Sequence, residues 1–248
     1  MSSKFWMDLE AVEKRLTKFF GDEKKSINDF GRTVNQTFEA FVFAQVINWY
    51  KTRKWNVSLI SPKGYRNSVR LKFNTRGRPD AYTYVRCERN GTRIQIRHAL
   101  RVATKSHLRD QWPPANVVLD VAVIKDKNLS DFESDSFVPN KALVTFGEAK
   151  HMSAFAELIA NFLGLVHEML PRKLRTNSAT AKRPVHPRPF LYVSGYLYRT
   201  AQGMRLTIKR RRLAVEIHDH TSTTFFSAPL PVKAPPTRRA LRDDELPF

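Results

Sequence analysis

The chain lacks the features that mark several large classes of protein. Its 248 residues include a single cysteine, Cys87, which excludes an internal disulfide and a zinc site built from several cysteines. No apolar run approaches the roughly 20 residues that a membrane-spanning helix needs, and Met1–Met7 is too short and too polar for a signal peptide. We therefore expect a soluble, cytoplasmic protein that has no membrane partner.

Acidic residues are also scarce. The chain has 43 Lys and Arg against 23 Asp and Glu, a formal net charge of +20. Such a basic balance is typical of proteins with a polyanionic partner, most often nucleic acid, although a ribosome-associated or merely basic protein would share it. Hydrophobic residues make up 42% of the chain, enough for one substantial core or at most two small ones.

Two short apolar runs carry isolated charges. Val117–Ile124 contains Asp120 as its only charge, and Ala142–Lys150 ends in Glu148 and Lys150. Both runs predict buried strands, in which a bare carboxylate costs several kcal/mol unless a partner or a metal satisfies it. Alternation along a strand places Glu148 and Lys150 on one side. If the two strands pair, three ionisable groups meet as a site for divalent metal and phosphate requires.

Two helices are predicted before these strands. Asp8–Phe20 has amphipathic spacing, whereas Val34–Tyr50, with Asn35 as the expected N-cap, is apolar nearly all round and therefore buried. The only charge in the second helix is Glu39. It is either a carboxylate favoured by the helix dipole near the N-terminus or a buried acid directed at the same metal as Asp120.

Basic residues alternate with apolar and aromatic ones between Tyr65 and Ser106, and Asn90-Gly91 predicts a hairpin turn. This region is either a cationic face for a nucleic-acid backbone, which we favour, or a solvated sheet surface. The connection Arg172–Pro189 and a cationic helix over Ala201–Arg212 add further basic residues. The residues expected to bind nucleic acid are Arg70, Lys72, Arg76, Arg78, Arg93, Arg97, Lys182, Arg183, Lys209, Arg210 and Arg211.

The remaining elements complete an alternating α/β pattern. Further strands are predicted over Trp55–Ile60, Phe190–Leu197 and Leu213–Ile217, and a further helix over Phe155–Leu170. We divide the chain into an N-terminal helix (1–30), one domain (31–227) and a tail (228–248) whose composition predicts disorder. His218 and His220 flank Asp219, but alternation along a strand points such neighbours to opposite faces and argues against a metal site.

This order of elements resembles the PD-(D/E)xK nuclease superfamily over roughly residues 30–220. The resemblance implies an α/β restriction-endonuclease-like core, a central mixed sheet flanked by helices, here with an inserted basic β-hairpin. It also implies that Asp120 and Glu148 bind Mg²⁺ or Mn²⁺, that Ala149 lends its backbone carbonyl, that Lys150 positions the attacking water and that Glu39 completes the site.

The chain departs from the family pattern in two places. Leu119 stands where the family has Pro before the Asp, and the long spacing between Asp120 and Glu148 implies an insertion near Asp126–Pro139. A literal Pro-Asp occurs at Pro79-Asp80, but no Glu-x-Lys follows soon after it. We therefore take Asp120 as the metal ligand and Asp80 as at most a substrate contact.

The chain ends in Asp243-Asp244-Glu245-Leu246-Pro247-Phe248, which is similar to the acidic tip of bacterial single-stranded DNA-binding proteins. In that family the terminal Phe enters an apolar pocket while the acids meet a basic rim. The resemblance implies a partner protein that recognises this tip, and a bacterial or phage setting. A second interpretation is that the tip folds back onto the basic groove of its own chain.

The sequence thus predicts a Mg²⁺-dependent deoxyribonuclease, a hydrolase of DNA phosphodiester bonds, with a tail that recruits a partner; whether it acts as an endonuclease or an exonuclease remains open. Antiviral defence, mobile-element biology and DNA repair are all compatible with it. Two alternatives remain open: a non-catalytic DNA-binding adaptor, and an RNA-directed nuclease. Strand preference and the formation of a homo-oligomer also remain open.

Overall fold

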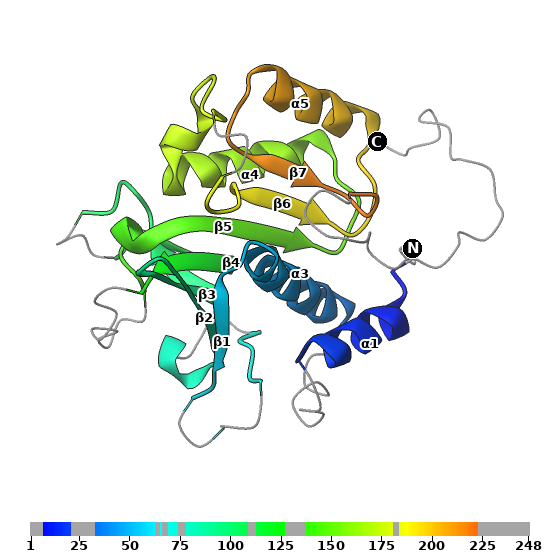
Figure 1. Ribbon diagram of the computed structural model, residues 1–248. Helices are drawn as coiled ribbons and strands as arrows, with labels where there is room; N and C mark the ends of the chain where they lie inside the picture. Colours follow the sequence, from blue (N-terminus) through cyan, green and yellow to red (C-terminus); the bar gives the residue numbers. More distant parts are fainter. Residues whose placement is uncertain are drawn as a thin grey trace.

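Seven strands form a single mixed sheet in the order β1-β2-β3-β4-β5-β6-β7 (Figure 1). The computed structural model describes residues 7–20, 33–62, 65, 69–73, 78–108, 113–126, 137–180 and 184–222. The strands are β1 (Asn56–Ile60), β2 (Tyr84–Arg89), β3 (Thr92–Ala103), β4 (Asn116–Lys125), β5 (Leu143–Lys150), β6 (Phe190–Val193) and β7 (Glu216–His218). Strands β1 to β5 are antiparallel, whereas β5, β6 and β7 run parallel. The expected α/β architecture, a mixed sheet flanked by helices, is confirmed.

Helices cover both faces of the sheet. The helices are α1 (Leu9–Phe20), α3 (Val34–Lys51), α4 (Ala156–Met169) and α5 (Arg199–Arg210), and short 3-10 turns occupy η2 (Pro79–Ala81), η3 (Asn140–Ala142) and η4 (Pro171–Leu174). Helix α3 packs on β1, β3, β4 and β5, with α1 against its outer side, while α4 and α5 pack together over the other face (Figure 1). None of the helices in the described ranges is long and apolar enough to cross a membrane.

The central strands are buried on both sides, which explains why their sequences read as nearly continuous apolar runs. In β6, Phe190 and Tyr192 belong to the core under α3, whereas Leu191 and Val193 belong to the core under α4. Strand β6 ends at Val193, earlier than predicted, because the chain bends at Ser194 and Gly195. The backbone N–H of Ser194 donates to the carbonyl of Lys150 at 3.1 Å.

The hairpin turn between β2 and β3 was predicted correctly, whereas the N-cap of α3 was not. Asn90 and Gly91 have φ angles of 50° and 72°, which confirms the hairpin turn between β2 and β3. The N-cap of α3 is Thr33 rather than Asn35. The Thr33 hydroxyl oxygen accepts the backbone N–H of Gln36 at 3.2 Å, and Asn35 lies inside the helix.

The later boundaries shift by a few residues. Helix α5 begins at Arg199 and ends at Arg210, and β7 covers Glu216–His218 rather than Leu213–Ile217. The connection between α5 and β7 therefore takes up residues that were expected to lie in the strand. Most of the insertion predicted near Asp126–Pro139, namely residues 127–136, and the whole of the predicted tail (228–248) lie outside the described residues.

Gly147 on β5 leaves room for an aromatic ring directly below the candidate site. A Cβ at this position would lie 2.0 Å from the Cζ of Phe190. Gly147→Ala should therefore lower the free energy of unfolding by about 1–3 kcal/mol or more, because a tightly packed interior responds to an added methyl group by strain. Chemical denaturation would measure this, with Gly203→Ala in α5 as the control.

The control replaces a glycine whose added Cβ meets nothing within 4 Å. In an exposed helix this change should leave stability unchanged or raise it by up to about 1 kcal/mol. Equal stability of the two alanine variants would contradict the close packing of Gly147 on Phe190.

Candidate functional site

Strands β4 and β5 bring the three predicted ionisable groups together. Val121 pairs with Gly147 in the antiparallel ladder, so Asp120 and Glu148 are neighbours on adjacent strands. The Nζ atom of Lys150 lies 2.9 Å from Asp120 Oδ2 and 3.1 Å from Glu148 Oε2. The predicted clustering of Asp120, Glu148 and Lys150, with the last two on one side of β5, is thus present in the structure.

The backbone of β5 fixes the orientation of Asp120. The N–H of Ala149 donates to Asp120 Oδ2 at 2.9 Å, so this oxygen accepts from both a backbone amide and a lysine. Charge-assisted hydrogen bonds of this kind are roughly twice as strong as neutral ones. Asp120 is therefore held as an oriented carboxylate between two paired, buried strands.

Glu148 is the electrostatically unusual member of the group. Burial and, to a smaller extent, the neighbouring Asp120 raise its pKa, Lys150 opposes both effects, and the net result is a pKa of about 8. Glu148 Oε1 is buried and has no hydrogen-bond partner among the described residues. A native structure rarely leaves a buried carboxylate oxygen without a partner, so this atom marks a place that a ligand would satisfy.

Lys150 supplies the only positive charge of the group. Burial lowers its pKa, but the charges of Glu148 and Asp120 outweigh that effect and hold its pKa well above the usual range. The ammonium group therefore stays charged and bridges the two carboxylates. Its positive charge lies between the two acids and reduces the repulsion between them.

The donor set fits a hard divalent cation. Asp120 and Glu148 offer carboxylate oxygens and Ala149 a backbone carbonyl, the ligand chemistry that Mg²⁺ prefers, and Mg²⁺ commonly keeps several waters with few protein ligands. Among the described residues, no three His, Cys, Asp or Glu side chains converge to hold a metal. Such an ion would therefore depend on two carboxylates, a carbonyl and water.

Glu39 does not join the two acids. Its Oε2 lies 3.5 Å from His98 Nε2 on β3, and His98 Nδ1 contacts the carbonyl of Lys72 at 2.6 Å. Glu39 also lies beyond the first turn of α3, where the helix dipole acts most strongly. The role of Glu39 as a metal ligand stays a prediction without contact support, and its observed partner is a buried histidine.

Two of the expected nucleic-acid-binding residues are buried, so their assignment to an exposed face is wrong. Lys72 is 2% exposed and Arg97 is 5% exposed. The Arg97 guanidinium donates to Pro79 O and Gln95 Oε1 and lies 4.2 Å from the Tyr84 ring centroid. Burial lowers the pKa of Arg97 to about 10. Its role is to tie β3 to neighbouring segments.

The other residues that were expected to bind nucleic acid, where the structure describes them, lie on the surface in two regions. Arg70, Arg78 and Arg93 are exposed near the β2–β3 hairpin, where Arg78 pairs with Asp80 and Arg93 with Glu88. Lys209, Arg210 and Arg211 are exposed at the C-terminal end of α5. Arg76, Lys182 and Arg183, like the tip Asp243–Phe248, lie outside the described residues.

A polar pair beside the site was not predicted. His151 follows Lys150 directly, and its Nδ1 lies 2.8 Å from the hydroxyl oxygen of Ser194 at the end of β6. Burial lowers the pKa of His151 and so favours the neutral imidazole. Its position after Glu-Ala-Lys could have drawn attention to His151, but no sequence signal indicated Ser194, which is brought there by the parallel pairing of β5 and β6.

Comparisons with protein-family models, with curated proteins and with solved structures found no match to this chain.

Proposed function

We propose that the chain is a metal-dependent nuclease with a restriction-endonuclease-like fold that hydrolyses DNA phosphodiester bonds. One observation carries the proposal: Asp120, Glu148 and Lys150 meet across two buried strands, and Glu148 keeps a buried oxygen without a partner. A purely structural role would favour a neutral, fully hydrogen-bonded arrangement at this depth. The order of helices and strands agrees with the same fold.

Each residue has a separate task in this proposal. Asp120 and Glu148 would hold Mg²⁺ or Mn²⁺ together with the carbonyl of Ala149, and Asp120 is oriented for this by the Ala149 amide. A bound divalent cation would lower the pKa of a coordinated water and stabilise the charge that develops on the phosphate. Lys150 would place fixed positive charge beside the attacking water.

The basic surface supports nucleic acid as the substrate. A net charge of +20 and the exposed cations of the hairpin and of α5 provide the sequence-independent attraction to a phosphate backbone. DNA is the proposed substrate, and RNA is distinguished from it in the assay below. A protein that recognises the acidic tip remains the proposed partner, which would bring the nuclease to its site of action.

The test is cleavage of plasmid DNA, single-stranded DNA and single-stranded RNA by the purified full chain in Mg²⁺, Mn²⁺ or EDTA. We expect metal-dependent cleavage of DNA that falls at least about 100-fold in Asp120→Asn, because this change removes a charge that the site provides for the metal. Binding of DNA in EDTA should stay within about two-fold of the parent chain, since the cationic surface is unchanged.

Asp80→Asn is the matched control, because Asp80 is the acid of the literal Pro-Asp and is exposed. It should cleave like the parent chain. Cleavage that survives both EDTA and Asp120→Asn would overturn the proposed site. Tight, salt-sensitive binding of DNA without cleavage under any metal condition would favour the non-catalytic adaptor instead.

A further inference from the structure

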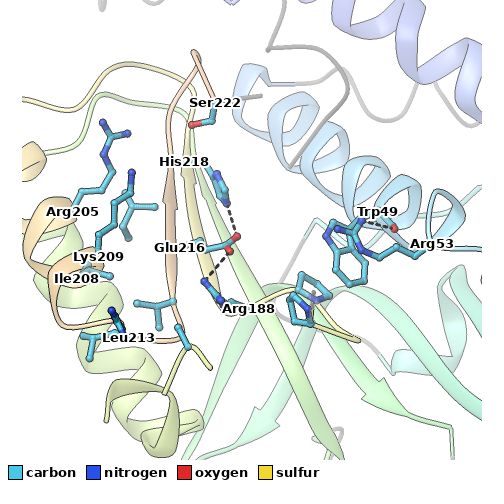
Figure 2. A pocket seen from close by; sticks show the side chains of 16 residues that line it. Trp49, Arg53, Arg188, Arg205, Ile208, Lys209, Leu213, Glu216, His218 and Ser222 are labelled. Carbon is cyan, nitrogen blue, oxygen red and sulfur yellow. Dashed lines mark hydrogen bonds and ion pairs between the residues drawn. The ribbon is translucent and has the colours of Figure 1, made fainter. Parts of the chain in front are cut away.

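A cavity of about 660 Å³ lies away from the candidate site, around the edge strand β7. Figure 2 shows α5 and β7 on one side of it and the C-terminal end of α3, with Trp49 and Arg53, on the other. Cavities of this size are typical of sites that enclose one compact ligand. A DNA duplex instead contacts a broad outer surface, so the cavity fits a small group or a few residues of peptide.

The lining of the cavity is strongly cationic. Five basic side chains line it, namely Arg53, Arg188, Arg205, Lys209 and Arg212. Glu216 is the only acid in the lining, and it is already engaged by Arg188 at 3.6 Å and by His218 at 3.3 Å (Figure 2). Arg205 pairs with Asp219 at 3.1 Å, whereas Lys209 and Arg212 form no ion pair within the described part of the chain. The cavity therefore has unneutralised positive charge and attracts an anion.

The same cavity also presents apolar surface. Its remaining lining includes Trp49, Pro184, Pro187, Ile208, Leu213, Val215 and Ile217. Like-charged side chains gathered around an apolar wall repel one another unless a ligand supplies the opposite charge. The ligand that satisfies both parts of this lining carries several negative charges next to compact apolar groups.

One segment of the chain has this composition and can reach the cavity. Ser222, the last described residue, lines the cavity. The sequence after it, 223–242, contains four cations and no acid, and is followed at once by Asp243-Asp244-Glu245 and then Leu246-Pro247-Phe248. A segment joined to the cavity through a linker of this length has a roughly millimolar effective concentration there, so even a weak site is occupied.

We propose that this cavity is a binding site for acidic peptide and that its occupant is the segment Asp243–Phe248 of the same chain. The acids pair with Lys209 and Arg212, while Leu246 and Phe248 cover the apolar wall. The proposal does not depend on nuclease activity. It also implies that an outside protein must compete with this internal site in order to bind the tip.

The test follows amide hydrogen exchange of Asp243–Leu246 and Phe248 by NMR in the full chain at low salt. Exchange should be about ten-fold slower than in the double variant Lys209→Glu/Arg212→Glu, as expected for a tip that is docked about nine-tenths of the time. The matched control is Arg210→Glu/Arg211→Glu, which changes the net charge equally on the same helix but alters no lining residue. It should keep the protection.

Two results would overturn the proposal: a tip that exchanges equally fast in all three proteins, or one that stays protected in both variants. Loss of oligonucleotide binding in Lys209→Glu/Arg212→Glu alone, without a change in tip exchange, would assign the cavity to nucleic acid. Should the cavity variant not fold, Asp243→Lys/Asp244→Lys/Glu245→Lys tests the same contact from the tip. There, the backbone amides of cavity residues such as Ile217 and His218 should shift relative to the parent chain.

Discussion

Lys150→Ala is expected to lower the rate of metal-dependent cleavage by about 100- to 1,000-fold, the usual cost of removing one fixed charge that stabilises a transition state. Metal affinity should stay at or above that of the parent chain. Lys150 Nζ lies 2.9 Å from Asp120 and 3.1 Å from Glu148, so its positive charge competes with that of a bound cation. Isothermal titration of Mg²⁺ together with a cleavage assay measures the two effects separately.

The same variant makes a separate prediction about stability. Without Lys150, Asp120 loses its counter-charge and ionisation of Glu148 becomes still less favourable. The metal-free variant should therefore melt at a lower temperature than the parent chain, and Mg²⁺ should raise the melting temperature of the variant more than that of the parent. Lys125→Ala, an exposed lysine at the end of β4, is the control and should change neither property. Loss of Mg²⁺ binding in Lys150→Ala would contradict the role assigned to the lysine.

The candidate site was predictable because it depends on local alternation. Isolated charges inside apolar runs identify Asp120 and Glu148, and the spacing of Glu148 and Lys150 already places both on one face of a strand. Pairing of the two strands was only a condition of the prediction, and the β4–β5 ladder in the structure meets it. The order of the elements and the hairpin at Asn90-Gly91 were confirmed for similar reasons, since a turn of that type requires positive φ at both positions.

Features that depend on distant contacts could not be read in this way. Lys72 and Arg97 alternate like surface residues, yet both are buried. The segment around Pro79 lies over Arg97 on β3, and Lys72 belongs to a separate segment whose carbonyl contacts His98. His98 as the partner of Glu39 is equally invisible, since it requires the packing of α3 across the sheet. The sequence shows which side chains share a face, whereas tertiary packing decides which of them remain exposed.

The cationic cavity illustrates the same limit on a larger scale. Its lining combines the end of α3, the segment after residue 183, and the α5–β7 region, which are far apart in sequence. In the basic run at the end of α5, Lys209, Arg210 and Arg211 were predicted together to bind nucleic acid. The structure divides it, because Lys209 and Arg212 line the cavity whereas Arg210 and Arg211 do not. The two pairs of residues can therefore be reversed in charge separately and compared.

Glu148→Gln should abolish metal-dependent cleavage while making the metal-free fold more stable at alkaline pH. Burial first, and Asp120 second, raise the pKa of Glu148 to about 8 in the folded protein. Between its ordinary value and about pH 8 the unfolded chain is ionised while the folded chain retains the proton, so stability falls as the pH rises through this window. The expected total is on the order of a few kcal/mol, and the glutamine variant should lack this slope.

At alkaline pH, Mg²⁺ should make the parent chain more stable than Glu148→Gln. A carboxylate must lose its proton before it can bind the metal, so at about pH 9 Mg²⁺ stabilises the parent chain strongly and the variant little, and at about pH 5 it stabilises neither by much. Melting temperatures with Mg²⁺ or EDTA at both pH values measure this crossing, with Glu157→Gln on the exposed side of α4 as the control. If Mg²⁺ raises the melting temperature of the parent chain no more than that of Glu148→Gln at alkaline pH, the buried carboxylate of Glu148 is not a metal ligand. If the crossing occurs, the buried acid lowers the stability of the metal-free fold, and metal binding is the function that accounts for it.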